Sequence, residues 1–327
     1  MTGGWEEIDD CFDTPFACTS ILDNPRKIYE YLRSKVYKQD EACKAAAMIL
    51  YNHVHKRIVS RNIFCGPAGV GKSYIWQIIK DKLYPYVIIT DASTMTKTGW
   101  SGSNKISSPL FQINPSIRAG YIIVYDEFDK CVRPQYSKDE NVSSCIQSEL
   151  LMMLQPSDEY MRLKSSDGKE RTIKVDNISY IFCGSFAEAA QNEADKKRTS
   201  GLGFGAVKNE SKLFEEKLSM KNLVDFGLIQ EIASRISRLV NLRPLTEEDY
   251  RYLLKEHTNS PINRIESMYG LYNGFIEKNI LSNSDMEEIA SNAYRSGLGV
   301  RSITSAIQRK LDDYIFEHFD NMKYLEY

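Results

Sequence analysis

Through the first three quarters of the chain, short apolar runs alternate with stretches that repeat with helical period. The predicted strands cover residues 62–65, 87–90, 121–125 and 178–183, and the main predicted helices cover 40–57, 72–83 and 144–154. Continuous apolar strands separated by helices indicate a parallel sheet that is covered by helices on both faces. We therefore expect an α/β fold, an αβα sandwich with a parallel sheet.

The pattern changes after Arg243 and Pro244, where predicted strands stop and helical periodicity continues to the end. The last predicted helix carries an apolar stripe. Its residues are Ile303, Ile307, Leu311, Ile315 and Phe319. We predict an N-terminal tail (1–23), a large domain (24–243) and a small C-terminal helical domain (244–327). The polar, glycine-rich stretch 195–212 is predicted to be an exposed loop.

A phosphate-binding motif follows the first predicted strand and opens the next helix. It consists of Gly66, Pro67, Ala68, Gly69, Val70, Gly71, Lys72 and Ser73. Its glycines let backbone N–H groups turn toward phosphate oxygens at the positive end of the helix. Lys72 is expected to reach the β- and γ-phosphates, and the Ser73 hydroxyl to bind Mg²⁺. The sequence thus predicts ATP and Mg²⁺ as ligands.

Two carboxylates, Asp126 and Glu127, end the apolar run at 121–125. Ligands bind at the carboxyl ends of parallel strands, so both acids should face the phosphate-binding loop. We expect Asp126 to hold Mg²⁺ through water and Glu127 to polarise the attacking water. An acidic pair alone is a weak signal, because strand ends are often acidic. Together with the loop it predicts ATP hydrolysis.

Composition and charge exclude several other classes of protein. The formal net charge of −2 provides no basic field for nucleic acid, and no apolar run has the length of a membrane span. The acidic N-terminus does not look like a signal peptide, which predicts a cytoplasmic protein. The seven cysteines form no Cys-x-x-Cys pair and only four histidines are present, so a zinc site is not expected.

Several segments, in order along the chain, resemble the AAA+ unfoldases of the ClpX type. These segments are 25–57, 91–102, 126–130, 227–235 and 299–303, and the resemblance covers nearly all of residues 24–319. It implies an AAA+ P-loop sandwich with a small helical domain, assembled as a ring of six identical subunits. HslU is also similar, but this chain has no room for its large inserted domain.

The resemblance implies further positions around the nucleotide. ATP would lie between the two domains, near Val36 and Tyr37, and at the border with the next subunit. Arg235 would act as an arginine finger on the γ-phosphate held by the neighbouring subunit, with Arg238 as a rival. The position of the family's sensor-2 arginine is occupied by Leu298, and Arg295, one turn earlier, is the candidate to compensate.

Two loops would contact other polypeptides if the resemblance holds. The pore loop consists of Gly99, Trp100, Ser101 and Gly102, with Trp100 in place of the usual tyrosine. The polar stretch 130–147 would form a second pore loop. The tripeptide Leu202, Gly203 and Phe204 is similar to the one that docks ClpP-type peptidases. For each apolar side chain the alternative is burial against its own domain.

The family's zinc-binding N-terminal domain has no counterpart in this sequence, in keeping with its cysteines. The resemblance implies an ATP-dependent unfoldase that threads protein substrates through a ring pore and feeds a ClpP-type peptidase. The alternative is a non-processive AAA+ remodeller or ATP-driven switch that acts on a dedicated protein partner. The aromatic pore loop favours the first hypothesis, and Leu298 favours the second.

Overall fold

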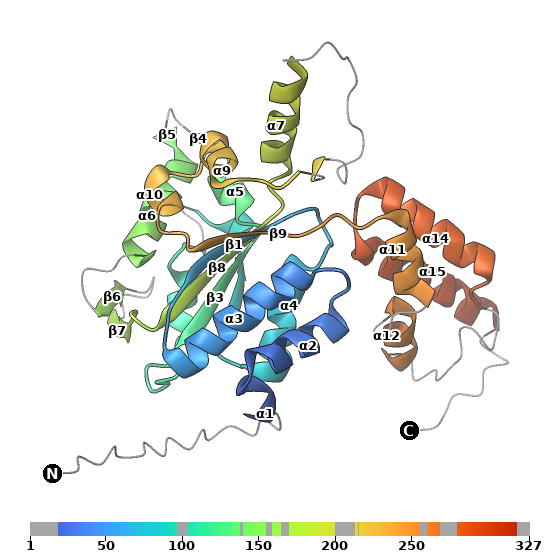
Figure 1. The fold of residues 1–327 in the computed structure, drawn as a ribbon, viewed down its shortest axis with the longest axis horizontal. Helices are drawn as coiled ribbons and strands as arrows, with labels where there is room; N and C mark the ends of the chain where they lie inside the picture. The colour runs from blue at the N-terminus through green and yellow to red at the C-terminus, as the bar shows by residue number, and fades with distance from the viewer. Residues whose placement is uncertain are drawn as a thin grey trace.

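A five-stranded sheet forms the centre of the fold (Figure 1). The computed structural model describes residues 19–96, 104–137, 140–154, 159–164, 170–199, 213–214, 216–255, 260–268 and 280–318. The strands are β1 (Arg61–Cys65), β2 (Val87–Asp91), β3 (Tyr121–Asp126), β8 (Ile178–Gly184) and β9 (Arg238–Asn241). They are all parallel, in the order β2-β3-β8-β1-β9. The predicted α/β fold with a parallel sheet is confirmed.

Helices cover both faces of the sheet, because alternate strand residues point to opposite sides. Phe64 and Val124 pack on one side against α2 (Pro25–Lys35), α3 (Asp40–Lys56) and α4 (Lys72–Ile78), which continues as the π-helical turn η1 (Ile79–Leu83). Ile63 and Tyr125 pack on the other side against α5 (Asp129–Val132), α6 (Val142–Leu154), α9 (Met220–Phe226) and α10 (Gln230–Ala233). Both layers of the predicted sandwich are therefore present.

Three regions differ from the sequence prediction. Between the predicted helix at 144–154 and the predicted strand at 178–183, β6 (Tyr160–Lys164) and β7 (Glu170–Lys174) pair as an antiparallel hairpin that the sequence did not predict. The expected loop at 195–212 begins as the end of a helix, α7 (Ala187–Thr199). The stretch 130–147 contains the short hairpin β4 (Tyr136–Ser137) and β5 (Glu140–Asn141) between α5 and α6. A further helix, α1 (Thr19–Leu22), lies within the expected tail.

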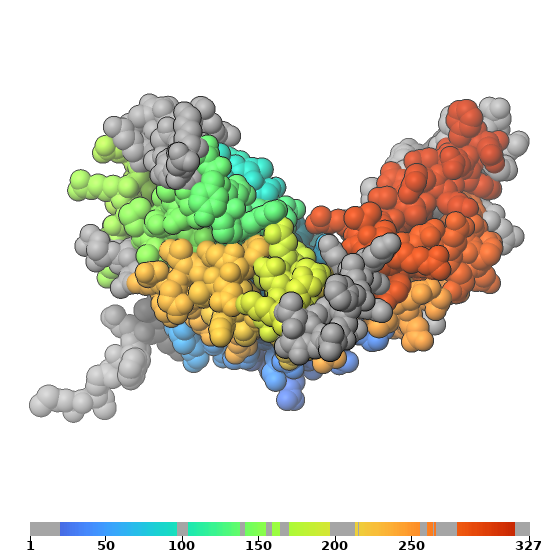
Figure 2. Space-filling view, turned by 90° about the horizontal axis from the view of Figure 1, so that it is seen from above, coloured from blue at the N-terminus to red at the C-terminus, as the bar shows by residue number. Residues whose placement is uncertain are grey.

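All described elements after β9 are helices: α11 (Glu247–Lys255), α12 (Pro261–Met268), α14 (Asn283–Ser296) and α15 (Val300–His318). The stripe on α15 is fully buried at Ile303, Ile307 and Leu311. Figure 2 shows these helices as a lobe beside the sheet portion, with a hollow between the two. The division of the chain into two domains near residue 243 stays a prediction, which this arrangement supports. No described helix combines the length and the apolar character that crossing a membrane requires.

Candidate nucleotide site

The glycine-rich loop 66–71 joins the end of β1 to the start of α4. Gly66, Gly69 and Gly71 have φ values of 150°, 70° and 105°, a region that favours glycine. Lys72 is the first residue of α4 and is buried, and its ammonium donates to the carbonyl oxygens of Gly66 at 2.7 Å and Pro67 at 2.6 Å. The loop therefore curls around the lysine side chain, in the strand–loop–helix context that a phosphate-binding loop requires.

Burial lowers the pKa of Lys72, while nearby groups, among them the carboxyls of Asp129 and Asp126, act in the opposite direction. Asp126 ends β3 and Asp129 is the first residue of α5, so this strand end and the helix after it bring carboxylates close to the lysine. Ser73, the second residue of α4, is half-buried. The structure thus brings the glycine-rich loop and the acidic strand end together, as the sequence predicted for one site.

The turn after β3 holds Glu127 in the left-handed region, with a φ of 54°. A residue with a side chain costs about 1–2 kcal/mol in this conformation. The Glu127 N–H donates to Oδ1 of Asp126 at 3.0 Å, and the next residue, Phe128, donates its N–H to the carbonyl of Cys183 in β8 at 2.8 Å. These contacts fix the turn while the Glu127 side chain stays exposed, as activation of a water molecule requires.

Asp129 is a buried carboxylate to which the sequence analysis gave no individual role. Its Oδ1 accepts a hydrogen bond from the N–H of Ser185 at 3.1 Å, which links the turn after β3 to the turn after β8. A Cβ atom on Gly184 would lie 2.9 Å from the same oxygen, so the close approach requires glycine there. The run Asp126-Glu127-Phe128-Asp129 was a visible signal, but only the fold shows which acid is buried.

The segment after α2 lies between the glycine-rich loop and α11. Val36 is buried, and its Cγ1 would lie 3.4 Å from a Cβ atom placed on Gly71. The ring of Tyr37 stacks on Tyr252 of α11 with centroids 4.7 Å apart. Val36 and Tyr37, predicted to lie near ATP, are thus placed beside the phosphate-binding loop and the C-terminal helices respectively.

Two polar contacts extend the link between this segment and the C-terminal part of the chain. Lys38 forms an ion pair with the buried carboxylate of Asp249 in α11. The side-chain amide of Gln39 donates to the Arg243 carbonyl and accepts from the Arg243 N–H, both at 2.9 Å. A buried amide that bonds both backbone groups of one residue fixes the connection between β9 and α11.

Backbone atoms of the phosphate-binding loop lie against the start of the last C-terminal helix. A Cβ atom placed on Gly69 would lie 2.6 Å from Cα of Gly299 and 3.0 Å from N of Val300, the first residue of α15. Leu298, the residue at the expected sensor-2 position, has an exposed fraction of 65%. The phosphate-binding loop and the start of α15 are therefore in backbone contact, while position 298 offers no arginine.

Comparison with known proteins shows which proteins this chain is similar to. Residues 62–173 match the family "ATPase family associated with various cellular activities (AAA)". The chain is 27% identical to the ATP-dependent Clp protease ATP-binding subunit ClpX of Treponema denticola, covering 93% of this chain and 79% of the relative. It is 26% identical to ClpX of Bacteroides thetaiotaomicron (90% and 77%) and to ClpX 2 of Wolinella succinogenes (91% and 78%).

The chain is similar along most of its length to ClpX-type AAA+ proteins. The matched segment includes the glycine-rich loop and the Asp126–Glu127 turn, and the chain is accordingly an ATPase. The similarity to the ClpX relatives also extends well beyond the AAA match, which ends at residue 173. Nucleotide binding and ATPase activity are thus confirmed, whereas the roles of individual residues stay predictions.

Arg235 lies far from the phosphate-binding loop of its own chain. The N–H of Ser237, two residues later, donates to the carbonyl of Arg61 at 2.7 Å, at the start of β1. The loop follows the other end of β1, and four residue steps of about 3.3 Å separate Arg61 from Cys65. Arg235 donates to the carbonyl of Glu231, and its rival Arg238 is exposed on β9. This position suits action on a neighbouring subunit.

Two of the predicted sites lie outside the described residues. These are the pore loop, with Gly99, Trp100, Ser101 and Gly102, and the docking tripeptide Leu202, Gly203 and Phe204. Both stay predictions. No group of three or more residues that could hold a metal ion occurs among the residues that the structure describes.

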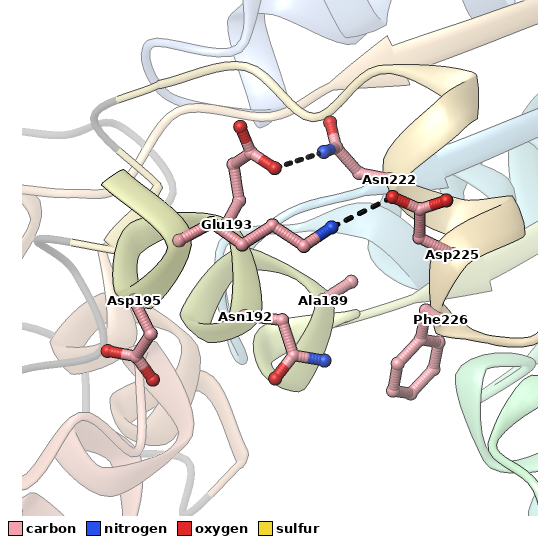
Figure 3. A pocket seen from close by; sticks show the side chains of 8 residues that line it. Ala189, Asn192, Glu193, Asp195, Asn222, Asp225 and Phe226 are labelled. Atoms are coloured by element: carbon pink, nitrogen blue, oxygen red, sulfur yellow. Dashed lines mark hydrogen bonds and ion pairs between the residues drawn. The ribbon is translucent and has the colours of Figure 1, made fainter. Parts of the chain in front are cut away.

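A separate hollow of about 360 Å³ lies between α7 and α9 (Figure 3). Lys196 pairs with Asp225 at 2.9 Å across it, and Asn222 donates to Glu193 at 2.8 Å. The hollow shares no lining residue with the phosphate-binding loop. The polar groups that line the hollow bond to one another. We therefore interpret the hollow as the surface between two packed helices and not as part of the nucleotide site.

Proposed function

We propose that this chain is an ATP-driven protein unfoldase and translocase that works as a ring and delivers substrates to a ClpP-type peptidase. The observation that carries the proposal is the match to ClpX along about nine tenths of the chain, together with an ATP site that touches the C-terminal helices. The relatives are ATP-binding subunits of a protease by name, which supports a peptidase partner for this chain as well.

The residues around the phosphate-binding loop fit ATP hydrolysis. Lys72 already binds two carbonyl oxygens, and phosphate oxygens are acceptors of the same kind with more negative charge. Glu127 orients and polarises the attacking water, and Asp129 holds the turn that carries Glu127 against β8. Ser73 and Asp126 offer only oxygen ligands, which is the donor set that Mg²⁺ prefers. When bound there, Mg²⁺ neutralises charge on the phosphates.

Hydrolysis would move the C-terminal helices because the loop and α15 are in backbone contact. Gly69 and Gly299 approach so closely that a shift of the loop by a fraction of an ångström displaces one of them. The contacts of Tyr37 and Lys38 with α11 form a second connection. In a ring of six subunits, such movements would be passed to the pore loop around Trp100, which grips the substrate.

The second candidate function is a non-processive remodeller or ATP-driven switch that acts on a dedicated protein partner. The observation that favours it is Leu298, which is exposed where relatives of this type carry a nucleotide-sensing arginine. An exposed leucine cannot donate to phosphate. ATP binding and hydrolysis would then drive a change of shape without threading a chain.

One experiment separates the two functions and tests the site. Purified protein is mixed with ATP and a tagged, folded fluorescent reporter, with and without ClpP, and both ATP hydrolysis and loss of fluorescence are followed. Lys72→Ala should lose nucleotide binding, whereas Glu127→Gln should bind ATP and not hydrolyse it. Hydrolysis by Glu127→Gln at the wild-type rate would refute the role of Glu127.

Loss of reporter fluorescence that depends on ATP and on Trp100 supports threading. Hydrolysis with an intact reporter supports the remodeller instead. The peptidase is tested by capture of ClpP on immobilised protein, where Leu202→Ala with Phe204→Ala should abolish capture. Retention of ClpP by this double variant, or no capture by the unaltered chain, would contradict peptidase docking through this tripeptide.

A further inference from the structure

A cluster of hydrogen-bond donors lies at the end of the sheet opposite to the phosphate-binding loop. Arg61 opens β1, and its register partner in β8 is Tyr180. Residues in register on adjacent parallel strands point to the same face and lie about 4.8 Å apart. The hydrogen bond from Ser237 to the Arg61 carbonyl brings the segment that carries Arg235 against the same point. Two guanidinium groups and one phenol thus gather from three elements.

Two buried atoms of this cluster have no hydrogen-bond partner within the described ranges: Nε of Arg61 and the hydroxyl of Tyr180. Burial lowers the pKa of Arg61, Tyr180 raises it, and the charge of Arg235 lowers it. No carboxylate in the part of the chain that the structure describes contributes to that pKa. Buried polar groups are nearly always hydrogen-bonded. Arg61 Nε and the Tyr180 hydroxyl are two exceptions side by side, next to the like charges of Arg61 and Arg235, and this arrangement requires an explanation.

We propose that Arg61 is a second guanidinium that contacts, together with Arg235, the terminal phosphate of ATP bound by the neighbouring subunit. The inference rests on the proposed function, in which Arg235 acts on the adjacent subunit. Arg61 cannot serve its own nucleotide, because the whole length of β1 separates it from the loop. A partner anion from outside the subunit would relieve the repulsion between the two arginines.

The charge and geometry of the cluster favour a phosphate over a single carboxylate. A terminal phosphate carries more than one negative charge and three oxygens, which two planar guanidinium groups can bind through paired N–H groups. Charge builds up on these oxygens during phosphoryl transfer, and a second guanidinium spreads it further. A carboxylate of the neighbouring subunit carries one charge and two oxygens, so it cannot bind both guanidinium groups through paired N–H groups.

The test uses rings mixed from two kinds of subunit. Acceptor subunits carry Arg235→Ala and keep Glu127, so they hydrolyse ATP only when a neighbour supplies the finger. Donor subunits carry Glu127→Gln and do not hydrolyse ATP themselves. Donors with Arg61 should restore hydrolysis, and donors with Arg61→Gln should lower kcat by about tenfold with a smaller change in KM, since the lost contact is made in the transition state.

Three further kinds of donor subunit test whether a lower kcat is specific to the loss of the Arg61 guanidinium. Arg26→Gln removes an exposed arginine on α2 and should leave kcat unchanged. Arg61→Lys keeps the charge without the paired N–H groups and should give an intermediate kcat, which also covers the case that Arg61→Gln does not fold. Donors with Arg235→Ala test the finger itself: full hydrolysis with them would refute the role of Arg235.

Equal kcat with Arg61, Arg61→Lys and Arg61→Gln donors, while Arg235→Ala donors fail, would overturn the inference and leave the proposed function intact. Ring assembly without nucleotide is measured by sedimentation for the same donors. If Arg61→Gln rings dissociate without nucleotide, Arg61 binds a protein group of the neighbour, and the assignment to phosphate is wrong. Intact rings with a lowered kcat support it.

Discussion

The contact between the phosphate-binding loop and α15 can be tested with two glycines of one turn. Gly297 and Gly299 have nearly equal φ values, 68° and 72°. A Cβ atom on Gly297 would meet nothing within 4 Å, whereas one on Gly299 would lie 2.5 Å from Cα of Gly69 and 2.7 Å from the carbonyl oxygen of Ala68. Gly297→Ala is therefore a matched control for Gly299→Ala.

Both alanine variants carry the cost of a left-handed backbone conformation, and only Gly299→Ala also carries the cost of steric overlap. Placing alanine in the left-handed region costs about 1–2 kcal/mol at either position. At Gly299 the added methyl group also overlaps backbone atoms, which cannot rotate away, where unstrained contacts are about 3.5–4.0 Å. Relief of such overlap typically costs another ~1–3 kcal/mol. We expect the loop and α15 to move apart in Gly299→Ala and to stay in contact in Gly297→Ala.

Thermal unfolding measures the loss of stability in each variant, and binding of a fluorescent ATP analogue measures the effect on the nucleotide site. Both variants are made in the Glu127→Gln background, so that hydrolysis does not interfere. Gly297→Ala should lower the free energy of unfolding by about 1–2 kcal/mol and keep its affinity for the analogue. Gly299→Ala should bind the analogue about tenfold or more weakly, since about 1.4 kcal/mol corresponds to one factor of ten. Equal affinities for the two variants would refute the coupling argued from this contact.

Three other predictions follow from buried or exposed side chains. Burial lowers the pKa of His53 from 6.5 to about 4, so its contribution to stability is complete above pH 6.5 and is lost as the pH falls toward 4, by about 3 kcal/mol at most. Denaturant titrations of His53→Gln should show a flatter dependence on pH. Leu298→Arg should raise ATP affinity or the hydrolysis rate in steady-state assays, because the exposed position then holds a cation. Tyr180→Phe should leave thermal stability unchanged or raised, because its buried hydroxyl has no partner in the described ranges.

Each of these predictions has a result that would contradict it. Parallel pH profiles for His53→Gln and the unaltered chain would assign the acid sensitivity to other groups. If Leu298→Arg leaves both affinity and rate as they were, nucleotide sensing at position 298 has been replaced or dropped. A Tyr180→Phe variant that unfolds several degrees lower would mean that its hydroxyl has a bonding partner in solution.

Three of the four strands that the sequence predicted are buried on both faces. The strands at 62–65, 121–125 and 178–183 are continuous apolar runs because helices cover both sides of the sheet, and the structure extends them by a residue at most. The edge strand β9 was missed. It has four residues, only one of which is buried, so its sequence has no apolar run to detect.

The components of the nucleotide site were visible in the sequence, but their connection to the C-terminal helices was not. The glycine-rich loop and the acids at 126 and 127 are short motifs with a fixed local context. Gly69 and Gly299 lie far apart along the chain, and no local pattern indicates that they touch. The same holds for Gln39 and Arg243, whose paired hydrogen bonds depend on the final packing.

The carbonyl contacts of Lys72 have a consequence for the speed of the catalytic cycle. The ammonium group of Lys72 already donates hydrogen bonds to the carbonyl oxygens of Gly66 and Pro67. Binding of ATP therefore exchanges these carbonyl acceptors for phosphate oxygens, and the ammonium group is hydrogen-bonded both before and after binding. The contribution of Lys72 to ATP affinity is therefore only the difference in free energy between its hydrogen bonds to phosphate oxygens and its hydrogen bonds to the two carbonyl oxygens. Because Lys72 can return to the two carbonyl oxygens of its own loop, the product nucleotide can dissociate over a modest barrier. Rapid exchange of product for fresh ATP is what a motor with many power strokes needs from its binding site.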